Sequence, residues 1–110
     1  MFGSKTDKIK GLAEKKKGGK IAGFLNDRSK EVVMAAIEGL GACGGEDAVN
    51  GLVPLLRSTD AAIRIATANA MATMGDPRTK AHLDFQLKHE TDPKVKDAIV
   101  HALGSIRSKD

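Results

Sequence analysis

The segment that decides the fold is DPKVKDAIVHALG, residues 92–104. Its apolar residues recur at intervals of three and four, and they are Val95, Ala98, Ile99, Ala102 and Leu103. This spacing places them on one face of an α-helix, whereas a half-buried strand would require strict alternation. Asp92-Pro93 predicts the helix start, because an aspartate side chain accepts from free amides and proline fits the first helical position.

Two earlier segments repeat this pattern, at spacings of 31 and 32 residues. They are VVMAAIEGLG (32–41) and IRIATANAMA (63–72). The aligned columns agree in chemistry: Val32, Ile63 and Val95 are β-branched, and Ala35, Ala66 and Ala98 are all alanine. A helical pattern that recurs at this period is typical of repeat proteins, in which each unit buries its apolar face against its neighbours.

A second helix lies between successive copies. Its leucines also recur at a spacing of 31 residues, in the pairs Leu52/Leu56 and Leu83/Leu87, preceded by Ile21/Leu25. Each unit is therefore a helix A, a turn and a helix B, with Gly44 and Gly75 ending B helices. We expect a first helix near 5–17, A helices near 20–26, 46–57 and 77–89, and B helices near 29–42, 60–74 and 92–107.

These residues resemble the HEAT repeat, in the short prokaryotic form that is also found in phycobilin lyase subunits. The motif residues are Asp92-Pro93-Lys94-Val95, Ala102-Leu103-Gly104 and Gly75-Asp76-Pro77. The resemblance implies an all-α, right-handed α-solenoid of about three helical hairpins, whose B helices line the concave side. Residues 1–19 would form a basic segment and capping helix, and 20–110 the repeat domain. Val33 and Lys96 stand where the family has arginine, so a continuous ladder of these arginines is not expected.

The positive charge is concentrated at the N-terminus. The net charge is +4, but residues 1–20 carry seven lysines against Asp7 and Glu14, and the remainder is close to neutral. A neutral body argues against nucleic acid as the partner of the repeats. One alternative is that the segment contacts phosphates or an anionic surface, through Lys8, Lys15, Lys16 and Lys17. We favour a solvated face on a capping helix, because no aromatic residue is interleaved to stack on bases.

The function that the repeat favours is a non-catalytic scaffold that binds another protein through its B helices. Two columns of these helices face outward, namely Met34, Ile65 and Asp97, and Glu38, Asn69 and His101. Met34 and Ile65 are apolar where family members are polar, which is typical of an interface; the alternative is that both tuck against neighbouring helices. The C-terminal helix has no following repeat, so Val100 could support a homodimer, although Ile99 is expected to fill the local core.

The sequence argues against an enzyme and against a bound cofactor or metal. Cys43 shares a column with Met74 and Ile106, which predicts a core residue. His89-Glu90 resembles the pairs with which HEAT-like deoxyhypusine hydroxylases bind iron, but a single pair supplies too few ligands. A bilin lyase-like subunit remains an alternative that rests on the resemblance. With one cysteine, no signal peptide and no apolar run of about 20 residues, we expect no membrane span and a cytoplasmic location.

Overall fold

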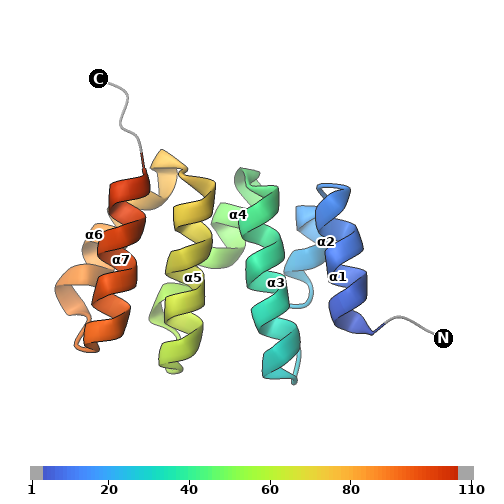
Figure 1. The fold of residues 1–110 in the computed structure, drawn as a ribbon, viewed down its shortest axis with the longest axis horizontal. Helices are drawn as coiled ribbons and strands as arrows, with labels where there is room; N and C mark the ends of the chain where they lie inside the picture. The colour runs from blue at the N-terminus through green and yellow to red at the C-terminus, as the bar shows by residue number, and fades with distance from the viewer. Residues whose placement is uncertain (1–3, 107–110) are drawn as a thin grey trace.

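The chain is all-α in the computed structural model, which describes residues 4–106 (Figure 1). Its helices are α1 (Lys5–Glu14), α2 (Gly18–Ala22), α3 (Lys30–Cys43), α4 (Gly45–Leu52), α5 (Ala61–Met74), α6 (Lys80–His89) and α7 (Pro93–Ser105). Two 3₁₀ segments, η1 (Val53–Arg57) and η2 (Pro77–Thr79), complete the second and third A helices. Residues 4–106 contain no strand, and the predicted all-α solenoid is confirmed.

The helices form two layers (Figure 1). Helices α1, α3, α5 and α7 lie side by side as one row, which we call the helix row, and α2, α4 and α6 lie behind it. The molecule measures 46 Å along its longest axis, which follows the row, and 17 Å along its shortest. The B helices are therefore neighbours of one another, and α1 covers the flank of α3 as the first member of the row.

The largest differences from the predicted boundaries lie at the N-terminus. Helix α1 ends at Glu14 instead of residue 17, because the chain turns sharply at Lys16, whose φ is +58°. Helix α2 begins at Gly18, so the predicted division between residues 19 and 20 falls inside it. The B helices begin one residue later than predicted, since Ser29, Asp60 and Asp92 are their N-caps. The last B helix ends at Ser105, and residue 107 lies outside the described residues.

The repeated columns meet in one core. Val32 and Val95 are buried, and Ile63 packs half-buried against the same cluster. Ile99 is fully buried, which confirms that it fills the local core. In the same column the buried Thr67 hydroxyl donates to the carbonyl of Ile63 at 2.7 Å, so its polar atom is satisfied within the helix. Position in the repeat thus determines burial, and the side chains themselves vary.

Glycine allows α3 and α5 to approach closely. A Cβ placed on Gly41 would lie 2.9 Å from the Cβ of Ala70 and 3.0 Å from its Cα, which is closer than carbon atoms pack. Gly104 occupies the same column of the repeat in α7, the last described helix of the row, and a Cβ there would meet nothing within 4 Å. Gly41 is therefore required by the neighbouring helix, whereas Gly104 meets no neighbour among the described residues.

The same turn starts each B helix. Its N-cap side chain accepts from a backbone amide of the first turn: Ser29 from Val32, Asp60 from Ala62, and Asp92 from Lys94. Two residues earlier, a second side chain accepts from the N–H of the cap itself. These pairs are Asp27–Ser29 at 2.9 Å, Ser58–Asp60 at 3.1 Å and Glu90–Asp92 at 3.1 Å. The free amides at these helix starts are thereby paired by local side chains.

Ion pairs tie each helix of the row to the turn that starts the next one. They are Lys5–Asp27 at 2.7 Å, Lys30–Asp60 at 2.8 Å and Arg64–Glu90 at 3.0 Å. The lysine partners hold the pKa of Asp27 and of Asp60 below the ordinary value. Burial alone would raise the pKa of Glu90, but hydrogen bonds from Arg64, Gln86 and the Asp92 amide outweigh it and lower the pKa. These ion pairs therefore form a continuous ladder along the row, although Arg64 is the one arginine among their three cations.

We predict opposite effects for alanine at the two equivalent glycines. Gly41→Ala forces α3 away from the Ala70 backbone and lowers the free energy of unfolding by about 1–3 kcal/mol. Gly104→Ala adds a better helix former in open space and raises it by up to about 1 kcal/mol. Urea denaturation followed by circular dichroism measures both. Equal effects at the two positions would contradict the close packing of α3 on α5.

We predict that Arg64→Ala destabilises the fold by about 3 kcal/mol, because it leaves the buried Glu90 carboxylate without its cation. Arg78→Ala is the matched control, since Arg78 pairs with Asp76 on the surface and its loss changes stability far less. The pKa of Glu90 in the folded chain is lowered, so the stabilisation is fully present above the ordinary pKa of 4.5. It is lost as the pH falls below 4.5 and through the lowered pKa of the folded chain. The difference in the free energy of unfolding between wild type and Arg64→Ala, measured by urea denaturation, should therefore become smaller in acid. A difference that stayed constant with pH would exclude Glu90 as its source.

Candidate functional site

Open grooves run between neighbouring helices of the row. The groove between α1 and α3 has a volume of about 700 Å³, that between α3 and α5 about 570 Å³, and that between α5 and α7 about 340 Å³. All three lie on the row and share lining residues. Glu38 borders the first two grooves and Asn69 borders the second and third, so the row presents one continuous grooved surface.

Alanine lines all three grooves. The alanines that line them are Ala13, Ala35, Ala42, Ala66, Ala70 and Ala72. Helices pack closely where their facing side chains are small, and a methyl group leaves the space above the contact empty. The repeated alanine column at positions 35 and 66 therefore has two consequences: it brings the helices together, and it leaves an apolar floor between them.

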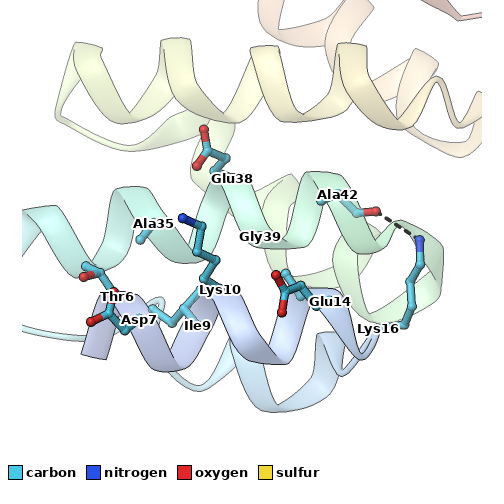
Figure 2. Close-up of a pocket in the computed structure, with 11 residues that line it drawn as sticks. Thr6, Asp7, Ile9, Lys10, Glu14, Lys16, Ala35, Glu38, Gly39 and Ala42 are labelled. Atoms are coloured by element: carbon cyan, nitrogen blue, oxygen red, sulfur yellow. Dashed lines mark hydrogen bonds between the residues drawn. The ribbon is translucent and has the colours of Figure 1, made fainter. Parts of the chain in front are cut away.

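The rim of the first groove carries charges of both signs (Figure 2). Lys10 extends from α1 toward α3, and Glu38 points from α3 away from α1. Glu14 lies on the α1 side, and the Lys16 ammonium reaches the carbonyl of Ala42 at 3.5 Å. An apolar floor between mixed charges is suited to a polypeptide, which offers apolar side chains together with amides and charges of either sign.

The structure brings together four of the six residues predicted for partner binding. Glu38 and Asn69 are exposed and lie between grooves, Met34 lines the second groove, and His101 lines the third. Ile65 and Asp97 line none of these grooves, and both Met34 and Ile65 are half-buried against the core. Glu38, Asn69 and His101 are thus more exposed than Met34 and Ile65. Partner binding by these residues stays a prediction.

The sequence reasoning did not include α1 in this surface. Thr6, Lys10 and Glu14 line the first groove together with α3. The expected role of α1 was a solvated cap, and its length and its single buried residue, Ile9, gave no repeat column to align. One signal was available: Ile9 and Ala13 are four residues apart, which marks the side of α1 that packs against a neighbouring helix.

The lysines predicted for anion contact are exposed. Lys8 lies on α1, and Lys15, Lys16 and Lys17 form the turn into α2. Lys16 also hydrogen-bonds the last turn of α3, where a cation is favourable next to free carbonyls. This contact gives Lys16 a role within the fold, and anion binding by the four lysines stays a prediction.

Residues considered for chemistry have structural roles. Cys43 is half-buried and packs against the core, with its thiol 3.9 Å from the carbonyl of Ala13. Glu90 of the His89-Glu90 pair is held by Arg64. Within the described residues, no group of three or more His, Cys, Asp or Glu is placed to hold a metal ion. Across the same residues, no helix has both the length and the apolarity to cross a membrane.

Comparison with known proteins identifies the family. A family model of HEAT repeats matches residues 21–104, which is well over half of the chain and spans α3 to the last turn of α7. A search of curated proteins finds no match, so the expected similarity to phycobilin lyase subunits stays a prediction. The repeated helix pairs, their side-by-side stacking and this match agree: the chain belongs to the HEAT repeat family.

Proposed function

We propose that this chain is a non-catalytic adaptor that binds another protein across the helix row. The observation that carries the proposal is the continuity of the three grooves, which Glu38 and Asn69 join into one surface. HEAT repeats generally mediate protein interactions, and a stack of repeats exposes such a surface along its whole length. The polypeptide would place apolar side chains in the alanine-floored grooves and polar groups on the rims.

The size of the surface supports a protein partner. Standard interfaces bury about 800 Å² on each partner and combine an apolar centre with a polar rim. The row is 46 Å long in the direction that crosses the grooves, which is enough for several contacts in sequence. Each groove is open to solvent, whereas sites for small molecules enclose most of the ligand.

We predict that Glu38→Lys together with Asn69→Lys reduces partner binding by at least about tenfold, because both long side chains would stand between grooves. The matched control is Glu46→Lys with Asn50→Lys. These residues have the same identities as Glu38 and Asn69, and they are exposed on α4 in the second layer.

The measurement uses a photo-crosslinking amino acid in cells of the source organism, placed at position 69 in the row or at position 50 in α4. Partners crosslinked from position 69 are identified by mass spectrometry and their affinity for the variants is then measured by titration. Crosslinks from position 50 alone, or equal affinity of both double variants, would contradict binding through the row.

A further inference from the structure

A second surface lies on the other layer, where α6 faces η1. Phe85 is 54% exposed, whereas most large apolar side chains of residues 4–106 are buried or partly buried. Its ring packs against that of His89, with centroids 4.4 Å apart and planes tilted by 46°. The ring is therefore held at the surface by a neighbour one turn away on α6.

A groove of about 360 Å³ opens beside this ring, between the end of η1 and the turn from α6 to α7. Arg57 and Ser58 line it from one side, and Phe85, His89 and Thr91 from the other. We call these five residues the α6 patch. Arg57 and Phe85 also border a smaller hollow on the other side of the ring. One aromatic face and one guanidinium therefore lie next to each other in a concave surface.

The groove offers hydrogen-bond donors without matching acceptors. Glu90 is the one carboxylate among its lining residues, and Arg64, Gln86 and the Asp92 amide already occupy its oxygens. Arg64 is paired in the same contact. Within residues 4–106, none of the ion pairs includes Arg57. The positive charge of Arg57 and the hydroxyls of Ser58 and Thr91 are thus complementary to a carboxylate.

The repeat does not require these residues. At the 31-residue spacing that aligns Leu83 with Leu52, Phe85 corresponds to Pro54 and His89 to Ser58. Leu83 is fully buried and serves the stack, whereas Phe85 and His89 are exposed. More than half of Phe85 lies outside the packing between repeats, and Pro54 and Ser58 give the preceding repeat no such ring pair, so the α6 patch is specific to this repeat.

We propose that the α6 patch binds an acidic segment of a partner protein, with a carboxylate on Arg57 and an adjacent apolar side chain on the Phe85 ring. Charge complementarity determines the partner: the groove has one unpaired cation, an apolar wall and neutral donors. A nucleic acid would be held poorly, because phosphate backbones require several cations in succession. The α6 patch is distinct from the helix row, so the experiments on the two surfaces test two independent proposals.

The test measures binding of the peptide Gly-Asp-Glu-Phe-Asp-Glu-Gly, fluorescently labelled and blocked at both ends, to the full chain by fluorescence polarisation. We expect saturable binding with a Kd below about 1 mM at low salt, and we expect added salt to weaken it. Phe85→Ala and Arg57→Gln should each reduce the affinity by about tenfold. The control peptide has Asn and Gln in place of Asp and Glu, and it should not bind.

Two variants are matched controls. Val100→Ala removes the other large exposed apolar side chain, and Arg28→Gln removes an exposed arginine next to the α3 cap; both should bind the peptide as wild type does. Circular dichroism shows that each variant is folded, and all four positions are exposed. The proposal is overturned by absence of saturable binding to wild type, by equal binding of the uncharged peptide, or by equal losses in the patch and control variants.

Discussion

No helix of the row can bury its apolar face alone. Each is amphipathic, and each packs at least one flank against a neighbouring member of the row, while the second layer covers its back. The closest of these contacts, Gly41 against Ala70, leaves no room for a side chain on α3. This mutual cover explains why residues at a spacing of 31 or 32 share burial although they differ in kind, as Ala36, Thr67 and Ile99 do. The fold is therefore a sum of neighbour contacts, in which the spacing of the repeat is the main constraint.

The start of each B helix fixes how neighbours align along their axes. All members of the row run in the same direction, so their N-termini lie along one edge (Figure 1). Amide groups at that edge carry partial positive charge, which the caps and the carboxylates of Asp27 and Glu90 offset. The same carboxylates receive a cation from the preceding helix, so one side chain both stabilises a helix start and holds the helix beside it. Sliding one helix past another would break both interactions together.

The sequence was sufficient for the stacking but only partly for the surface. Helix type and the burial of Val95 and Ile99 follow from periodicity, because apolar residues recur where neighbouring helices cover them. The Asp92 cap follows from the Asp92-Pro93 pair. The ion pairs could not be predicted in the same way. In the first two ion pairs the cation is a lysine directly after the N-cap, whereas in the third it is Arg64, one turn into α5. Residues from different repeat columns therefore supply the cation that holds the next helix start. The place of α1 in the row was missed because Ile9 is its one buried residue, and this leaves no repeat column to align with the B helices. The grooves depend on how the alanine-bearing helices lie beside one another, which a list of alanines does not reveal.

The two proposed surfaces differ in how tightly the fold constrains them. The groove floors of the helix row are the same alanines that let the helices approach, so enlarging Ala35 or Ala70 would fill a groove and also push neighbouring helices apart. Binding properties of the row must therefore vary mainly at the rims, where Glu38 and Asn69 are exposed. Phe85 and Arg57 have no part in the stack, and their substitution leaves the core unchanged. The physical reason to seek a ligand at the α6 patch is the groove there, whose lining combines the exposed Phe85 ring, the Arg57 guanidinium and a Glu90 carboxylate that already has its hydrogen-bond partners.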